Sequence, residues 1–193
     1  MPGKGAAIDS LRFVLRRACR ALADDGVVAY PTEAVYGLGC RPDSASATLR
    51  LAEIKRRDLH AGFILIAADR EQLEAFMAPL DARIERRLRR SWPGPVTWIV
   101  PATPAAPPWI TGGRDTVAVR VTAHPVARRL CETFGAALVS TSANISGRPP
   151  ARTALGVRRR FGDKLDIVVP GVAGGAARPT EIRDALTNEL LRA

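Results

Sequence analysis

Residues 116–144 have the sequence TVAVRVTAHPVARRLCETFGAALVSTSAN, which predicts a strand, a helix and a second strand in succession. Residues 116–121 alternate, with valine at positions 117, 119 and 121 on one face and Arg120 on the other. A helix is predicted for residues 125–134, and the apolar run at residues 137–139 predicts the second strand. If the valines face the core, Arg120 projects to the opposite side, where a ligand can reach it.

The same alternation of helices and strands extends along the chain in both directions, which predicts an α/β fold. We expect a first helix that is capped by Asp9 or Ser10 and ends at Gly26 in a left-handed conformation. Residues 32–39 should form a turn-rich connection, and the Pro-rich residues 101–113 a surface loop that is a candidate lid. The remaining predicted helices are residues 44–55, one or two within 70–91 broken near Pro79, and 153–161, and the remaining strands are 27–30, 63–66, 96–100 and 167–169.

No clear helix separates strand 96–100 from strand 116–121, so these two strands are expected to be antiparallel. The predicted fold is therefore a single domain, residues 1–193, in which a twisted mixed β-sheet is flanked by helices. No apolar run approaches the roughly 20 residues that span a bilayer, and the N-terminus does not resemble a secretory signal. We expect no membrane association and a cytoplasmic location.

The chain is strongly basic, with a net charge of +10 and a pI near 10.8. Most of this excess is arginine, which favours bidentate contacts with phosphate, so a nucleotide or a polyanion is a reasonable partner. The alternative for the run Arg83, Arg86, Arg87, Arg89 and Arg90 is the solvated face of a helix, and we favour that interpretation. The three cysteines are widely spaced and the two histidines lie in no recognisable catalytic motif, so no protein-held metal site is predicted.

Two short polar signatures, Lys55-Arg56-Arg57 and Ser142-Ala143-Asn144, each lie beside a predicted strand. Ligands in open α/β sheets bind beyond the carboxyl ends of strands, so a hydroxyl and an amide facing two cations there suggest a phosphate-bearing substrate. The alternatives are that the cations are ordinary surface residues and that the hydroxyl-rich run is a hydrogen-bonded turn. Neither a P-loop nor a G-x-G-x-x-G loop is present, so a nucleotide must be held in another way.

Five motifs together resemble the YrdC/TsaC family of threonylcarbamoyl-AMP synthases, over nearly the whole chain. They are PTEAVYGLG at residues 31–39, Lys55-x-Arg57, SWPGPVT at residues 91–97, Val119-Arg120-Val121 and STSANISG at residues 140–147. The resemblance implies a YrdC-like fold with a concave basic ligand face. It also implies an enzyme that converts L-threonine, bicarbonate or CO₂, and ATP to threonylcarbamoyl-adenylate and pyrophosphate. The product would pass to a tRNA threonylcarbamoyl-transfer complex.

The resemblance also assigns roles to single residues. Lys55 and Arg57 would contact the phosphates and the carbamate, Ser142 and Asn144 would orient the nucleotide, and Arg120 would bind the threonine carboxylate. Thr32, Ser140 and Thr180 would help to bind threonine or ATP. Mg²⁺ would enter with the phosphates of ATP rather than occupy a protein-held site.

The chain departs from the family pattern at a few positions. Many relatives have Thr at position 34, Pro at positions 58 and 62, and Ser-Thr at positions 180–181, where this chain has Ala34, Asp58, Gly62 and Thr180-Glu181. Asp58, next to Arg57, is expected to neutralise part of that cation.

Two other functions remain open at this stage. The first is a binding module whose basic face holds tRNA or ribosomal RNA without catalysis, and direct RNA contact is also compatible with the enzyme. The second is a hydrolase of nucleotides or acyl-adenylates with Ser142 as nucleophile. RNA binding through phosphates alone should weaken steeply with salt and ignore threonine. The synthase should instead bind ATP more tightly when threonine and bicarbonate are present.

Overall fold

The strand, helix and strand predicted within residues 116–144 form β5 (Thr116–Val121), α5 (Pro125–Phe134) and β6 (Leu138–Ser142). A proline in the first turn of α5 leaves no helical hydrogen bond unmade, and Gly135 ends the helix with a φ of 80°, which favours glycine. The strand β3 (Ile64–Ala67) lies between the other two, parallel to β5 and antiparallel to β6. The three predicted elements are therefore confirmed, with another strand inserted between the two that flank the helix.

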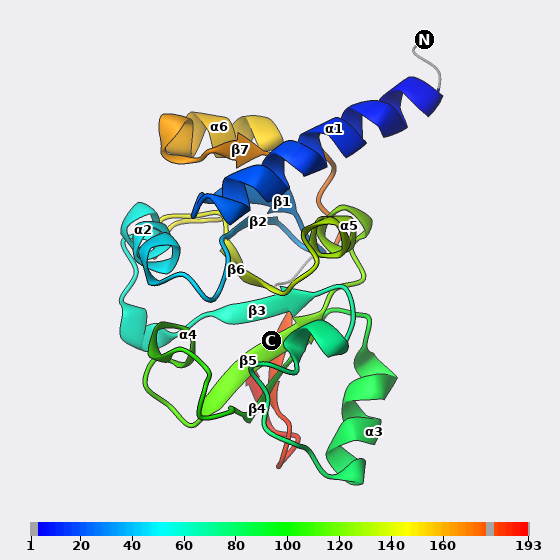
Figure 1. The fold of residues 1–193 in the computed structure, drawn as a ribbon, viewed down its shortest axis with the longest axis vertical. Coiled ribbons are helices and arrows are strands. Elements are labelled where there is room, and N and C mark those ends of the chain that lie inside the picture. Colours follow the sequence, from blue (N-terminus) through cyan, green and yellow to red (C-terminus); the bar gives the residue numbers. More distant parts are fainter. Residues whose placement is uncertain (1–3, 177–179, 193) are drawn as a thin grey trace.

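A computed structural model describes residues 4–176 and 180–192 (Figure 1). The other helices are α1 (Lys4–Ala23), α2 (Ala45–Lys55), α3 (Ala82–Ser91), α4 (Pro108–Thr111), α6 (Ala154–Phe161) and the short 3₁₀ turns η1 (Leu59–Ala61), η2 (Glu71–Leu73) and η3 (Gly162–Lys164). The other strands are β1 (Val28–Pro31), β2 (Tyr36–Gly39), β4 (Val96–Pro101), β7 (Ile167–Val168), β8 (Glu181–Asp184) and β9 (Leu190–Arg192).

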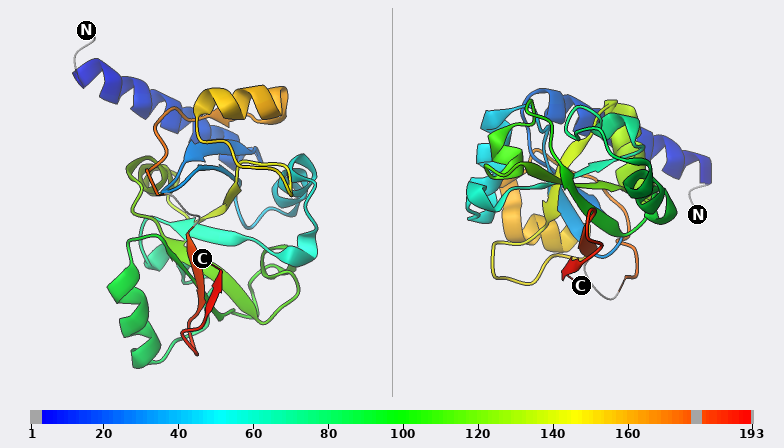
Figure 2. Two further views of the ribbon diagram at one scale, coloured as in Figure 1. Left: turned by 180° about the vertical axis from the view of Figure 1, so that it is seen from behind. Right: turned by 90° about the horizontal axis from the view of Figure 1, so that it is seen from below.

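Within the described residues, nine strands form one sheet in the order β7-β1-β2-β6-β3-β5-β4-β8-β9. β4 runs antiparallel to β5, as the missing helix between them predicts, and parallel to β8. Figure 2 shows helices on several sides of this sheet, which twists along its length. The predicted mixed α/β fold is confirmed.

Two apolar clusters hold the helices against the two faces of the sheet. Ile66 and Leu138 pack with α1 and α5 on one face. Their chain neighbours Leu65 and Val139 point the other way and pack with residues of α2, α3 and α6. The side chains of all four are fully buried, so the apolar burial that stabilises the fold is shared between both faces.

Several sequence-based expectations were wrong at the ends of elements. The first helix begins at Lys4 rather than after Asp9 or Ser10, and the left-handed residue after it is Asp25, with a φ of 59°, not Gly26. The expected connection at residues 32–39 contains the strand β2, and β8 and β9 were not predicted at all. The predicted strands β1 and β3 are just as short but are mostly apolar, whereas glycine or charged residues interrupt the apolar pattern in β2, β8 and β9.

The expected loop at residues 101–113 is packed against the body of the protein. It contains α4, whose Ile110 is 1% exposed. The amide of Phe63 donates a hydrogen bond of 2.9 Å to the Ile110 carbonyl, and a β-bridge pairs Met77 with Ala102. These contacts fix the segment at one side of the cavity described below.

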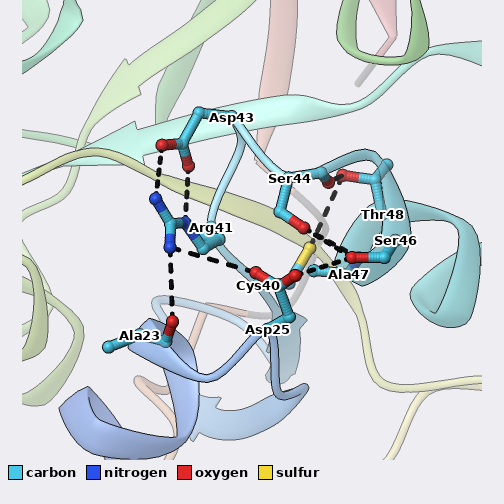
Figure 3. Close-up of polar contacts among 9 residues, drawn as sticks. All are labelled: Ala23, Asp25, Cys40, Arg41, Asp43, Ser44, Ser46, Ala47 and Thr48. Atoms are coloured by element: carbon cyan, nitrogen blue, oxygen red, sulfur yellow. Dashed lines mark hydrogen bonds and ion pairs between the residues drawn. The ribbon is translucent and has the colours of Figure 1, made fainter.

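A polar network fixes the start of α2 (Figure 3). Ser44 caps the helix by accepting an amide hydrogen bond from its first turn, and Ser46 donates a hydrogen bond of 2.6 Å to the Asp25 carboxylate. Arg41 makes two hydrogen bonds of 2.8 and 2.6 Å to Asp43 and lies 3.9 Å from Asp25. The network joins the end of α1 to the beginning of α2, and so it helps to place the K-x-R signature at the other end of α2.

Candidate active site

A cavity of about 330 Å³ lies on the sheet face that also carries α1 and α5. Residues that are paired across neighbouring strands form its floor. They are Ile64 of β3, Ala118 of β5 and Ser140 of β6. The volume is within the range of small-molecule sites, about 300–1,000 Å³. The cavity covers the middle of these strands as well as the carboxyl end of β6, so it extends further over the sheet than a site beyond the strand ends would.

Six of the eight predicted site residues line this cavity: Thr32, Arg57, Arg120, Ser140, Ser142 and Thr180. The other two, Lys55 and Asn144, contact each other beside Ser142. The two signatures therefore meet in space, as predicted. They meet by direct contact between Lys55 and the turn, and not across the cavity.

Lys55 is 2% exposed, and its ammonium group is surrounded by oxygen atoms of the S-x-N turn. Nζ donates to the carbonyl of Ser142 at 2.5 Å, to the carbonyl of Asn144 at 2.8 Å and to Oδ1 of Asn144 at 3.3 Å. Burial and the charge of Arg57 lower the pKa of Lys55 to about 8, while the three oxygens favour its charged form. This lysine holds the turn in place.

The S-x-N turn is a closed set of hydrogen bonds. Ser142 Oγ donates to Oδ1 of Asn144 at 2.6 Å, and Nδ2 of Asn144 donates to the carbonyls of Ile145 and Arg148 at 3.0 and 2.7 Å. The hydrogen-bonded turn that the sequence left as an alternative is thus present. The turn also places the exposed Ser142 at the cavity, where a ligand can reach it.

Arg57 is held in a fixed orientation at the cavity wall. Its guanidinium carbon lies 5.3 Å from the centroid of the Phe63 ring, and Nη2 donates to the Gly62 carbonyl at 2.9 Å. Its buried Nε has no hydrogen-bond partner among the described residues. Burial and the nearby positive charge of Arg114 lower the pKa of Arg57.

Asp58 does not neutralise Arg57 as expected. Its Oδ1 accepts a hydrogen bond of 2.9 Å from the amide of His60 and caps η1. Within the described ranges, no carboxylate lies within 4.0 Å of Arg57. Arg57 therefore keeps its charge available to a ligand.

Arg120 projects from β5 on the side opposite its valine neighbours, as the alternation predicts, and it is 5% exposed. Nη1 donates to Thr180 Oγ1 at 2.6 Å, and Nη2 lies 3.4 Å from Oε2 of Glu33. Glu33 also accepts hydrogen bonds from Thr122 Oγ1 at 2.6 Å and from the Ala123 amide at 3.1 Å. The sequence did not indicate that Glu33 would pair with Arg120 and hold its guanidinium in place.

Gly37 keeps space between two of the predicted binding residues. A Cβ atom at this position would lie 3.1 Å from Cγ2 of Thr32 and 3.4 Å from Oγ of Ser140. Thr32 itself donates a hydrogen bond of 2.7 Å to the Val35 carbonyl, which closes the turn between β1 and β2. Glycine in the family motif therefore leaves this part of the cavity open.

Two further arginines, Arg114 and Arg192, line the cavity with Arg57 and Arg120. The sequence did not single them out, because Arg114 directly follows the expected loop and Arg192 lies in the unpredicted strand β9. Burial, Arg120 and Arg57 lower the pKa of Arg192. Among the described residues that line the cavity there are four arginines and no carboxylate, so its electrostatic preference is for an anion.

The parts of the chain that the structure describes contain no group of three or more His, Cys, Asp or Glu side chains that could hold a metal ion. In the same parts, no helix combines the length and the hydropathy needed to cross a bilayer.

Comparison with known proteins shows to which family the chain belongs. Residues 20–193 match the family model Sua5/YciO/YrdC, which is described as telomere recombination. The chain belongs to this family. The Sua5/YciO/YrdC assignment confirms the resemblance drawn from the five motifs.

The family members include curated relatives of nearly the same length. The chain is 54% identical over 178 residues to the threonylcarbamoyl-AMP synthase of Nitrosococcus oceani, covering 92% of this chain and 96% of that protein. It is 56% identical over 180 residues to the threonylcarbamoyl-AMP synthase of Halorhodospira halophila, covering 93% and 94%.

A solved structure, P. abyssi Sua5 complexed with L-threonine, matches with a TM-score of 0.86 and 35% identity. The match covers 92% of this chain but 53% of the Sua5 chain, so this chain spans about half of that protein.

We predict that Glu33→Gln destabilises the protein by about 1–3 kcal/mol at pH 7, because Arg120 loses a charged partner in a buried site. Burial opposes ionisation of Glu33, but Arg120 and the hydrogen bond from Thr122 hold its pKa below the ordinary value of 4.5. The stabilisation is present above pH 4.5 and is lost as the pH falls through the lower folded-state pKa. Urea unfolding of both proteins between pH 3 and 7 tests this, and a difference that stays constant over the range contradicts it.

Proposed function

We propose that the chain synthesises threonylcarbamoyl-AMP from L-threonine, bicarbonate or CO₂, and ATP, with release of pyrophosphate. The observation that carries the proposal is a cavity lined by four arginines and by the S-x-N turn, in a chain that is 54% and 56% identical over 178 and 180 residues to synthases of nearly the same length. The Sua5 structure that contains L-threonine supports the choice of amino acid.

The proposed chemistry has two bond-forming steps. The threonine amine forms an N–C bond with CO₂ and loses a proton, which gives a carbamate. A carbamate oxygen then attacks the α-phosphorus of ATP, and the bond to pyrophosphate breaks. No covalent bond to the protein is required, so catalysis rests on positioning and on stabilising negative charge.

The arrangement supports separate tasks for the cavity residues. Arg57, Arg114 and Arg192 are the cations that can meet the triphosphate and the departing pyrophosphate. Arg120 lies deeper, and its fixed guanidinium suits the bidentate binding of the threonine carboxylate. Lys55 acts through the S-x-N turn that it holds, and is therefore a positioning residue.

Mg²⁺ enters this scheme as part of the substrate, bound to the phosphates of ATP. The described cavity lining offers no carboxylate, so a magnesium ion would find its oxygen ligands mainly on the nucleotide and in water. We further propose that the product passes to a tRNA threonylcarbamoyl-transfer complex and that the protein works in the cytoplasm.

The deciding experiment incubates the purified chain with MgATP, labelled bicarbonate and each amino acid in turn. We expect pyrophosphate release that depends on both threonine and bicarbonate, and a threonylcarbamoyl-adenylate mass with the label incorporated. Release that ignores threonine, or a product without the label, contradicts the proposal. An RNA-binding module without catalysis would give no release with any amino acid.

The hydrolase alternative is not favoured by the contacts of Ser142. Its hydroxyl donates to the Asn144 amide oxygen instead of to a base. The same assay separates the two functions, because Ser142→Ala should retain a fraction of synthase activity, whereas a serine hydrolase would lose all activity.

A further inference from the structure

Residues 170–176, with the sequence PGVAGGA, follow β7 and lead toward β8. We call them the strap. In the sheet, β7 and β8 are separated by the strands β1, β2, β6, β3, β5 and β4, so the chain has to cross the molecule between them. Figure 2 shows the strap in orange where it leaves β7. The strap itself does not line the cavity, but it contacts residues that shape the cavity.

Hydrogen bonds rather than apolar burial hold the strap in place. Its side chains are small, and the side chain of Val172 is 86% exposed. The amide of Gly174 donates to the Thr32 carbonyl at 2.8 Å, and the amide of Ala176 donates to the Glu33 carbonyl at 3.3 Å. A segment with little buried apolar area opens easily, so each of these polar contacts has a large influence on its position.

The strap packs closely on the turn between β1 and β2 because residue 174 is a glycine. A Cβ atom there would lie 2.6 Å from the carbonyl oxygen of Glu33, which is too short for a real contact with backbone. At the neighbouring Gly175, a Cβ atom would meet nothing within 4 Å. A methyl group at position 174 would therefore push the strap away from Glu33, whereas one at position 175 would not.

His124 connects the strap to the network around Glu33. It is 7% exposed and stands at the N-cap of α5. Its Nε2 lies 3.0 Å from the carbonyl oxygen of Val172, and because a carbonyl only accepts, Nε2 carries the hydrogen and donates it. The amide of His124 donates to Thr122 Oγ1 at 3.2 Å, and this hydroxyl donates to the Glu33 carboxylate at 2.6 Å.

These contacts lead to Arg120. Its guanidinium has two partners, because Nη2 lies 3.4 Å from Oε2 of Glu33 and Nη1 donates to Thr180 Oγ1 at 2.6 Å. The strap holds the backbone of Glu33 and precedes Thr180 in the chain. Bidentate binding of a carboxylate needs a guanidinium of fixed orientation, so a displaced strap would weaken that binding.

We propose that His124 is a positioning residue for threonine: it holds the strap on the turn between β1 and β2, and so keeps Arg120 oriented toward the threonine carboxylate. The inference rests on the proposed function, in which Arg120 binds that carboxylate. His124 is not among the described residues that line the cavity, so it acts through the strap. Tyr36 also holds the strap, by donating to the Gly171 carbonyl at 2.7 Å, but it lines the cavity and so cannot separate the two effects.

The first test compares His124→Leu with His124→Gln in steady-state kinetics, with threonine and ATP varied separately. Leucine cannot donate to Val172, while the backbone amide that contacts Thr122 is kept. We expect the KM for threonine to rise about tenfold in His124→Leu, with kcat and the KM for ATP within about threefold of the wild type. Glutamine carries an amide nitrogen as many bonds from Cα as Nε2 of histidine, so His124→Gln should recover the wild-type KM to within about threefold.

The second test moves the strap without changing His124. Gly174→Ala should raise the KM for threonine as His124→Leu does, and the matched control Gly175→Ala should leave it unchanged. Hydrogen exchange, which needs no activity, should be faster at the amides of residues 174 and 176 in both His124→Leu and Gly174→Ala. Urea unfolding should show that all four variants are folded.

The outcomes separate this inference from the proposed function. In an active wild type, the inference is overturned if His124→Leu keeps the wild-type KM for threonine, if His124→Gln is impaired as much as His124→Leu, or if the exchange of the strap amides does not change. A wild-type chain without threonine-dependent pyrophosphate release would contradict the proposed function, and with it the role of His124 in threonine binding.

Discussion

Replacement of Lys55 by methionine should lower threonine-dependent pyrophosphate release about 100-fold or more, the largest effect that we expect from a single substitution. Methionine has a similar volume but cannot donate, so three oxygens of the S-x-N turn lose their shared partner. The turn would then leave the position in which Ser142 meets the cavity. We expect a loss of about 1–3 kcal/mol in the free energy of unfolding, because buried acceptors are left unpaired.

Arg56→Met is the control for Lys55→Met. Arg56 is the adjacent cation and is exposed, and its side chain makes no contact with the turn among the described hydrogen bonds. Activity should stay within threefold of the wild type, and stability within about 0.5 kcal/mol. If Lys55→Met keeps a tenth of the wild-type activity or more, the turn does not depend on this lysine and its positioning role is wrong.

Substitution of Arg57 by alanine should lower the rate of pyrophosphate release about 10²-fold, and by at least tenfold, with a smaller effect on stability. This guanidinium is fixed by Phe63 and the Gly62 carbonyl, and no carboxylate of the described residues lies within 4.0 Å of it, so its electrostatic effect can act on the reacting phosphates. The measurement is steady-state kinetics with ATP and threonine varied separately. We expect the loss mainly in kcat, because negative charge develops on the departing pyrophosphate.

Arg57→Lys tests whether the positive charge at this position is sufficient without the planar shape of the guanidinium. Lysine keeps the positive charge but lacks the planar fork that stacks on Phe63, so it should recover only part of the rate. Urea unfolding should show that both variants are folded. Unchanged pyrophosphate release in Arg57→Ala would remove this residue from the proposed mechanism.

Most of the longer helices and strands could be predicted, because the apolar spacing that indicates each of them lies within one short segment. The helix at residues 125–134 and the strand at residues 116–121 have the predicted bounds, since apolar spacing over six to ten residues is enough to define them. The strands β2, β8 and β9 were not predicted because glycine or charged residues interrupt their apolar pattern, whereas the equally short β1 and β3 are mostly apolar. β9 carries Arg192, so a cavity residue was missed along with its strand.

In the candidate site, too, some features could be predicted from the sequence and others could not. The family resemblance identified six residues that line the cavity, but not the contact by which Lys55 holds the S-x-N turn, 87 and 89 positions further along the chain. The motifs also did not indicate the ion pair between Glu33 and Arg120. This pair forms only because β1, which precedes Glu33, and β5 belong to the same sheet.

The amino-acid sequence by itself determined the α/β class, the face of β5 on which Arg120 lies, and the family to which the motifs belong. Each of these follows from residue types and spacings within short segments. Only the tertiary structure decided which charges are buried, which are paired and which remain available in the cavity. The physical reason is that a charge responds to every group within a few ångströms, and strand order brings together groups from distant parts of the chain.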